Sequence, residues 1–241
     1  MNEVTRQLKA RKSVRAFEAR PVPDEILGEI LECALAAPTA GCQMLYTILH
    51  ITDPMIKSAL ARTCDNQPFI GTAPLVLLFL ADCRRWLDSY AYAGCEARAP
   101  READMLLACA DAVIAAQNAV TAAEALGLGS CYIGDIVEQR ETVTQLLALD
   151  PYVFPAALLV LGYPTAQQRA REKPERFARR FIVLENAYRR LTEAEHREMF
   201  AERGEDLDAF IPAFFKRKYE SAFMAEMVRS VAAYLEAFEE R

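Results

Sequence analysis

The sequence predicts a fold of the α/β or α+β class, in which helices pack on a central sheet. Three observations support this. Residues 24–37 place apolar side chains at the three-and-four spacing of an amphipathic helix, and residues 74–82 form a continuous apolar run typical of a strand buried on both faces. Residues 104–126 form a long pattern of Ala, Leu and small polar residues that predicts a further helix. Helical and strand patterns alternate through the central region, as expected for helices that cover a sheet.

The first half of the chain is divided by clear stop signals. The helix over 24–37 starts with acidic residues and ends at Pro38. Residues 46–52, YTILHIT, are rich in β-branched and aromatic side chains and predict a strand. An Asp53-Pro54 break follows, and a helix is expected from there to about Cys64.

The second half begins with the helix over 104–126, which ends where Gly127 and Gly129 supply a C-cap. With so few charged side chains, this helix must be buried over most of its circumference, either in a large core or against a partner subunit. The segment CYIGDI after it predicts a short strand or extended loop. A helix over 137–148 and a buried strand over 156–163 complete the pattern.

After Val183 the chain is charged and helical, with helices expected near 192–203 and 212–240. We therefore expect a main domain over residues 1–187 and a helical C-terminal extension over residues 188–241. Because this extension is rich in aromatic residues, it must pack on an apolar surface. These residues are Phe210, Phe214, Phe215, Phe223 and Tyr234.

Composition and charge exclude several classes of protein. The net charge of −6 over 241 residues argues against a nucleic-acid binder, because affinity for a phosphate backbone needs a basic face. The longest uncharged apolar stretch, Phe69 to Ala81, is too short to span a bilayer, which needs about 20 apolar residues. The N-terminus has no apolar core of a secretory signal. We expect no nucleic-acid or membrane partner and a cytoplasmic location.

The cysteines and histidines predict neither disulfides nor a metal site. The seven cysteines are widely spaced, which argues against a disulfide framework. The only histidines are His50 and His196, and no close Cys pair accompanies them, so a structural metal is not expected. With only two isolated histidines, the chain has few residues that could form a catalytic Ser-His-Asp triad or Cys-His dyad.

Basic residues nevertheless gather in two clusters on this acidic chain. One lies in residues 6–20 and comprises Arg6, Lys9, Arg11, Lys12, Arg15 and Arg20. The other lies in residues 169–180 and comprises Arg169, Arg171, Lys173, Arg176, Arg179 and Arg180. Arg binds phosphate oxygens in pairs and Lys supplies a point charge, so the two clusters together suggest one phosphate. The alternative is that both are solvated surface.

Three short segments have the composition of a site for a flat phosphorylated ligand. Residues 11–15, RKSVR, place a serine hydroxyl between cations, and alternation puts residues 11, 13 and 15 on one side of an extended segment. Residues 36–42, AAPTAGC, allow the backbone to approach a ligand closely. Residues 127–135, GLGSCYIGD, place an apolar, aromatic centre between glycines. The last two segments are equally compatible with a helix stop and a turn.

Taken in order, these pieces resemble the FMN-dependent nitroreductase family. That family has an Arg-x-Ser-x-Arg start, an Ala-Pro-Ser-x-x-Asn-type loop, a Gly-Leu-Gly-Ser/Thr-x-x-Ile-Gly stretch, and Gly-Tyr-Pro followed by Lys and Arg. This chain has RKSVR, APTAGC, GLGSCYIGD and GYPTAQQRAREKPER, so the resemblance covers residues 6 to about 180. Each motif is weak alone, and their order makes the set specific.

The resemblance implies an α+β fold with a mixed central sheet flanked by helices, and a homodimer with FMN at the subunit interface. It assigns the FMN phosphate and ribityl chain to Arg11, Lys12, Ser13, Arg15, Lys173 and Arg176. It assigns the lining of the ring or ribityl chain, from the partner subunit, to Pro38, Thr39, Ala40, Gly41 and Cys42. Backbone N–H groups near the flavin N5 would come from Ile133, Gly134 and Asp135. The flavin carries the electrons, so no catalytic side chain is expected.

Two residues depart from the family pattern. Cys42 stands where the family often has Asn, so we expect it to pack as a small hydrophobic residue rather than act as a reactive thiol. Glu175 separates Lys173-Pro174 from Arg176, where the family often has Lys-Pro-Arg. The contact of an individual basic residue here is therefore less defined than the cluster.

The expected function is transfer of hydride from NADH or NADPH through FMN to a small oxidised acceptor such as a nitroaromatic, quinone or enone. The chain has no Gly-x-Gly-x-x-Gly motif, so a nicotinamide would stack only transiently on the flavin. The alternatives are a specialised flavoprotein of the same fold, such as a dehalogenase, dehydrogenase or flavin-consuming enzyme, and a non-enzymatic FMN-binding protein. The segment 84–101 holds the only Trp and is a candidate lid, or a plain surface excursion.

Overall fold

Four strands form one sheet in the order β1-β2-β4-β3 in the computed structural model, which describes residues 2–239. The strands are β1 (Tyr46–His50), β2 (Leu75–Asp82), β3 (Gly129–Ile133) and β4 (Val153–Gly162). Every residue of β2 is buried, which confirms the prediction from its continuous apolar run. The four strands pair antiparallel, and the parallel part of the expected mixed sheet is limited to an isolated bridge between Ser13 and Ser130.

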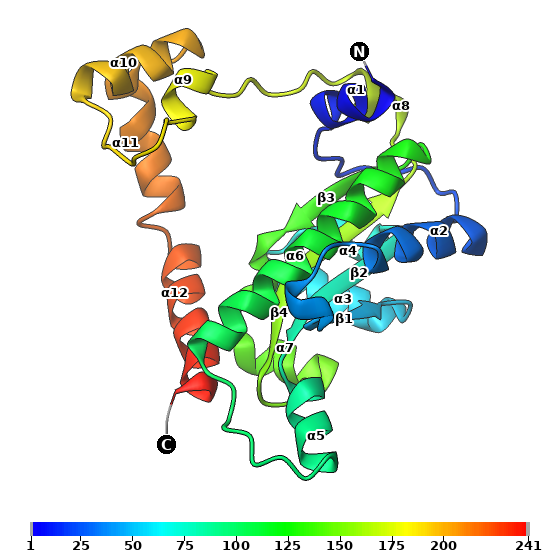
Figure 1. Cartoon of the computed structure of the whole chain (residues 1–241). Helices are drawn as coiled ribbons and strands as arrows, with labels where there is room; N and C mark the ends of the chain where they lie inside the picture. Colours follow the sequence, from blue (N-terminus) through cyan, green and yellow to red (C-terminus); the bar gives the residue numbers. More distant parts are fainter. Residues whose placement is uncertain (1, 240–241) are drawn as a thin grey trace. The chain divides into compact units, whose positions relative to one another are not determined.

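Helices α2 (Asp24–Leu35) and α6 (Glu102–Ala125) cover one face of this sheet (Figure 1). The core on this face joins Ile30 of α2 and Ala116 of α6 to Leu77 and Phe79 of β2. Because α6 presents mainly alanines to the sheet, its backbone can pack close to the strands. The prediction of an amphipathic helix ending before Pro38 is confirmed. The predicted central helix is present as α6 and buries the face that packs on the sheet, while its opposite face is exposed in the single chain, so burial over most of its circumference stays a prediction.

The other face is covered by α3 (Pro54–Thr63), α4 (Pro68–Thr72) and α7 (Arg140–Leu147). Leu60 and Val143 are fully buried there against Leu78 and Leu158, which face each other across β2 and β4. Asp53 caps α3 by accepting a hydrogen bond from the N–H of Met55 at 2.7 Å. The α+β class, with a sheet buried on both sides, follows from these two layers.

Helix α6 is long and apolar enough to cross a membrane if only length and composition are considered. Asp111 interrupts its uncharged run, so a search for long uncharged apolar stretches does not find this helix. A core helix passes the same test, and Ala108, Ala112, Ala115 and Ala119 of α6 are completely buried. We therefore assign α6 to the core.

The remaining helices connect this framework. They are α1 (Glu3–Ala10), η1 (Ala40–Cys42), α5 (Arg84–Tyr92), η2 (Gly134–Val137), α8 (Ala166–Ala170), α9 (Arg179–Ile182), α10 (Glu193–Glu202), α11 (Leu207–Lys218), α12 (Ala222–Leu235) and η3 (Glu236–Phe238). The predicted helix over 212–240 is wrong as one element, since the chain forms α11 and α12 with a break at Tyr219–Ser221. Residue 240, where that prediction ended, lies outside the described residues.

The chain divides into two compact units. Unit 1 comprises Met1–Arg171 and Glu226–Arg241, and unit 2 comprises Glu172–Ala225. The boundary expected between residues 187 and 188 falls inside unit 2. Within unit 2, Phe177, Phe200 and Phe210 gather around Arg203, whose guanidinium carbon lies 4.2 to 5.6 Å from their ring centres.

The segment 226–239 belongs to the core of unit 1. The ring of Tyr234 lies edge-on to Phe154 at 5.0 Å, and the ring of Phe238 lies edge-on to Tyr152 at 5.5 Å. Phe238 is 2% exposed and shares a core cluster with Met105 of α6. The aromatic residues at this end of the chain therefore stabilise the first unit.

Candidate flavin site

The RKSVR segment lies extended along the outer edge of β3. The N–H of Val14 donates to the carbonyl of Ser130 at 2.9 Å, and Arg11 Nη2 donates to Ser130 Oγ at 3.3 Å. Val14 points into the core and is 3% exposed, whereas Arg15 is exposed. Val14 and Arg15 therefore follow the predicted alternation, whereas Arg11, Lys12 and Ser13 are all half-buried.

Gly129, the first residue of β3, makes this close approach possible. A Cβ at this position would lie 2.5 Å from Val14 Cγ2 and 2.9 Å from Pro164 Cγ, closer than real carbon contacts allow. Only glycine lets Val14 pack directly on the strand, since it has no Cβ. The glycine therefore fixes the distance between the basic segment and the sheet.

Arg11 carries a buried hydrogen-bond donor that the described chain leaves without an acceptor. Its Nε is buried and has no partner, and its guanidinium carbon lies 5.9 Å from the ring centre of Tyr132. Burial raises the pKa of the nearby Glu124, while Arg11 and Lys12 act in the opposite direction. A buried cationic donor of this kind suits an oxygen of a bound phosphate, so the residues present fit a phosphorylated flavin.

Lys12 and Arg171 tie the basic segment to the chain after β4. Lys12 Nζ donates to the carbonyl of Arg169 at 2.8 Å and also to the carbonyl of Arg171. Arg171 in turn donates to the carbonyl of Ser13. Lys12 is thus engaged by backbone carbonyls, and Arg171, which the sequence placed in the second basic cluster but not among the assigned flavin ligands, helps to hold Ser13 in place.

The two flavin ligands assigned from the second cluster lie in the other unit. Lys173 and Arg176 belong to unit 2, whereas Arg11, Ser13 and Arg15 belong to unit 1. The structure therefore brings the first cluster together with β3. The joint phosphate site of both clusters stays a prediction.

Residues 38–44 form a tight loop between α2 and β1. Gly41, Cys42 and Met44 all have positive φ, at 55°, 57° and 49°. Pro38, Gly41 and Cys42 are exposed, and Thr39 and Ala40 are half-buried. The loop is held by Asp111 of α6, which sequence reasoning missed although it is a single carboxylate in an otherwise uncharged stretch of a buried helix.

The end of β3 places the last predicted segment beside Gln67. Ile133 is buried, whereas Gly134 is exposed with open space where a Cβ would stand. The amide of Gln67 donates both to the carboxylate of Asp135 and, at 3.0 Å, to the carbonyl of Cys64. The sequence carried no signal for Gln67, since only the fold brings this loop to β3.

A buried carboxyl group lies next to this end of the strand. Glu138 is 5% exposed, and its Oε1 has no hydrogen-bond partner among the described residues. Burial, together with Asp135, Asp65 and Glu226, raises the pKa of Glu138 to about 7. The surroundings of Asp135 are therefore acidic, in contrast to the basic start of β3.

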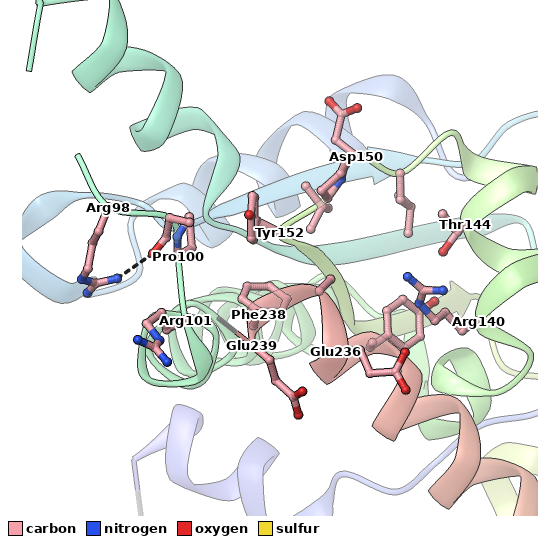
Figure 2. Close-up of a pocket in the computed structure, with 16 residues that line it drawn as sticks. Arg98, Pro100, Arg101, Arg140, Thr144, Asp150, Tyr152, Glu236, Phe238 and Glu239 are labelled. Carbon is pink, nitrogen blue, oxygen red and sulfur yellow. Dashed lines mark hydrogen bonds between the residues drawn. The ribbon is translucent and has the colours of Figure 1, made fainter. Parts of the chain in front are cut away.

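The structure also has two cavities that no predicted site residue lines. One, of about 310 Å³, lies between α5 and α6 and is lined by Trp86, Tyr90 and Gln43 among others. The other, of about 680 Å³, is lined by Arg140, Tyr152, Glu236 and Phe238 among others (Figure 2). Its lining mixes three arginines with three carboxylates and contains none of the predicted site residues, so it indicates no particular ligand.

The thiols and carboxylates form no metal site within residues 2–239, where no group of three or more His, Cys, Asp or Glu side chains is arranged to hold an ion. Burial raises the pKa of Cys64 and of Cys83 to about 12, which makes these two thiols unreactive near neutral pH. Cys42, by contrast, is exposed in the single chain.

Comparison with known proteins agrees with this arrangement. An FMN reductase [NAD(P)H] from Bacillus subtilis (strain 168) is 34% identical over 177 residues, which cover 72% of this chain and 70% of the relative. An oxygen-insensitive NADPH nitroreductase from Salmonella typhimurium is 33% identical over 205 residues, covering 84% of this chain and 82% of the relative.

Similarity to solved structures extends over nearly the whole chain. The crystal structure of nitroreductase A from Vibrio parahaemolyticus superposes with a TM-score of 0.84 at 25% identity and covers 98% of both chains. Residues 8–163 also match the profile of the Nitroreductase family, and this range contains the RKSVR, APTAGC and GLGSCYIGD segments. The chain belongs to the nitroreductase family.

Proposed function

We propose that this chain is an FMN-dependent oxidoreductase that transfers hydride from NADH or NADPH to a small oxidised acceptor such as a nitroaromatic, quinone or enone. The observation that carries the proposal is the buried, unpartnered Nε of Arg11 beside Ser13 and Ser130. Relatives named as an FMN reductase and an NADPH nitroreductase, each more than 30% identical, support it. FMN, when bound, supplies an isoalloxazine ring that takes up and passes on two electrons.

The residues divide into three tasks. Arg11, Lys12, Ser13 and Arg15, with Lys173 and Arg176, bind the phosphate and ribityl chain. Pro38, Thr39, Ala40, Gly41 and Cys42 line the flavin of the partner subunit, and Ile133, Gly134 and Asp135 offer backbone N–H groups to the ring. The open space at Gly134 supports the last task, since a flat ring can approach the backbone there.

A homodimer is part of this proposal, because residues 38–42 serve the partner's flavin. One stripe of α6 leaves Leu106, Leu107, Val113 and Ile114 between 40% and 65% exposed, and Leu35 of α2 is 51% exposed. Apolar side chains gathered on one helix face mark a surface that a partner covers. We further propose a cytoplasmic location, as the sequence leads us to expect.

Replacing Ile114 with Glu should convert the dimer to monomer at micromolar concentration, because the substitution buries a charge at the contact. Size-exclusion chromatography with light scattering measures this directly. Met55→Glu is the matched control, since Met55 is 76% exposed on α3, which covers the opposite face of the sheet. A dimeric I114E protein, or a wild type that is already monomeric, would contradict the proposed interface.

Visible absorption of the protein reconstituted with FMN tests the proposed function. Bands near 370 and 450 nm that bleach on anaerobic addition of NADH or NADPH are expected, since oxidised isoalloxazine absorbs at about these wavelengths and its reduced form does not. Return of the bands on adding a quinone would complete the reaction. Bound flavin that neither nucleotide bleaches would instead indicate the specialised or non-enzymatic alternative, and absence of flavin binding would overturn the proposal.

A further inference from the structure

The strongest unused feature of the molecule is Asp111, which lies in the middle of α6. It is the only charged residue of this helix between Asp104 and Glu124, and it is 3% exposed. Removing a carboxylate from water is costly unless donors replace the water. Hydrogen-bond donors around the Asp111 carboxylate must therefore compensate its burial in the core.

Within residues 2–239, this carboxylate accepts hydrogen bonds from residues 39–45, which lie in the loop after α2 or directly follow it. Thr39 Oγ1 donates to Oδ2, the N–H of Ala40 donates to Oδ1 at 3.0 Å, and the N–H of Leu45 donates to Oδ2 at 3.3 Å. Thr39 Oγ1 also accepts from the N–H of Met44 at 2.9 Å. Asp111 thus contacts both ends of the loop, directly and through the Thr39 hydroxyl.

The loop that Asp111 contacts has an unfavourable backbone. Cys42 and Met44 have φ of 57° and 49°, in the left-handed region that side chains with a Cβ disfavour. Such conformations persist only where the surroundings impose them. Two further donors act on the same loop: Trp86 Nε1 donates to the carbonyl of Gln43 at 2.8 Å, and Arg85 Nη1 donates to the carbonyl of Met44 at 3.2 Å.

We propose that Asp111 is a positioning residue that holds residues 38–44 in the strained conformation in which this loop receives the flavin. The inference rests on the proposed contact of Pro38 to Cys42 with FMN. Asp111 acts indirectly, without contacting the flavin, through the Thr39 hydroxyl and the backbone N–H groups of Ala40 and Leu45.

The physical effect is preorganisation. A loop already held in its binding conformation loses little conformational freedom when the ligand arrives, whereas a relaxed loop must be ordered at that moment and binds more weakly. The carboxylate suits this task because its two oxygens can accept several hydrogen bonds at once. A carboxamide keeps the shape but turns one acceptor into a donor.

The test compares FMN dissociation constants, measured by quenching of flavin fluorescence, for wild type, Asp111→Asn, Thr39→Val and the double variant. We expect Asp111→Asn to weaken FMN binding about tenfold, which is the loss of one charge-assisted hydrogen bond. Because Asp111 acts largely through Thr39, adding D111N to T39V should weaken binding by clearly less than it does alone.

Asn118→Ala is the matched control. Asn118 lies two turns further along α6, and its amide donates to the carbonyl of Cys33 in α2 at 3.1 Å, so it also ties α6 to a neighbouring element. We expect N118A to lower the thermal midpoint of the apoprotein but to leave FMN affinity within twofold of wild type. This separates positioning of the loop from general loss of stability.

Three results would overturn the inference: unchanged FMN affinity in D111N, equal loss of affinity in N118A, or full additivity of D111N and T39V. If D111N does not fold, T39S and T39V still decide: T39S keeps the hydroxyl that donates to Asp111 and should retain FMN affinity, whereas T39V removes it and should lose affinity. Wild type is measured first. Failure of wild type to bind FMN would refute the proposed function, whereas normal binding by wild type and D111N alike would refute only the role of Asp111.

Discussion

Replacing Arg11 with Ala is expected to weaken FMN binding by roughly 10- to 150-fold. The buried Nε of Arg11 has no acceptor among residues 2–239, so a phosphate oxygen gains a partner there without breaking an existing hydrogen bond. A hydrogen bond between charged groups stabilises by about 1.5–3 kcal/mol, and each 1.4 kcal/mol corresponds to about tenfold in affinity. The substitution also removes the contact that Arg11 makes with Ser130 Oγ at 3.3 Å.

Flavin fluorescence titration of R11A, R11K and R20A checks this expectation. Lysine keeps the charge but loses the planar fork, so R11K should bind with intermediate affinity. Arg20 belongs to the same basic cluster, and its guanidinium carbon lies 3.9 Å from the ring centre of Tyr163. R20A removes the same charge elsewhere and should bind FMN within about twofold of wild type. Equal losses in R11A and R20A would mean that net charge, not Arg11, attracts the ligand.

Glu138→Gln should stabilise the protein at pH 8 and leave its stability nearly unchanged at pH 4.5. The pKa of Glu138 is raised to about 7 in the folded chain, chiefly by burial, against an ordinary value of 4.5. Between these values the folded state holds a proton that the unfolded state has lost. The stabilisation from this proton is fully present below pH 4.5 and is lost as the pH rises through about 7.

The size of this effect follows from the shift. At about 1.4 kcal/mol per pKa unit, wild type loses on the order of 3 kcal/mol of unfolding free energy by pH 8, and the neutral glutamine avoids that loss. Urea unfolding of the apoprotein at pH 4.5 and pH 8 measures it.

The control is E141Q, because an Arg229 hydrogen bond lowers the pKa of the exposed Glu141. That variant should be equally or slightly less stable than wild type at pH 8. No gain in stability for E138Q at pH 8 would show that ionisation of Glu138 does not destabilise the folded chain.

The framework of the fold could be predicted because it depends on local patterns. The run over 74–82 could only be a strand buried on both faces, and the weakly charged pattern over 104–126 could only be a buried helix. The strand order β1-β2-β4-β3 could not be predicted, since the periodicity within one strand does not say which strand pairs with it. The break at Tyr219–Ser221 was also missed, because the apolar spacing continues across it.

The same difference between local patterns and long-range contacts applies to the candidate site. The Ser13 segment could be predicted because basic residues flank a serine there. Gly129 could be predicted because it follows the end of a long helical pattern. Gln67 left no trace in the sequence, since its role depends on the contact between two loops that are 68 residues apart. The sequence could not show that Lys12, a cation in the basic motif, donates to two carbonyls of its own chain, because both carbonyls lie more than 150 residues away.

The return of residues 226–239 to unit 1 has a consequence for how the protein is made. Phe238 and Tyr234 complete a core cluster with Met105 and Phe154, although unit 2 lies between them in the chain. A nascent polypeptide that has emerged as far as residue 225 still exposes the apolar surface that these two rings cover. Folding of unit 1 during synthesis must therefore pause with that surface open, and chaperones that recognise exposed aromatic patches have an interval in which to bind it.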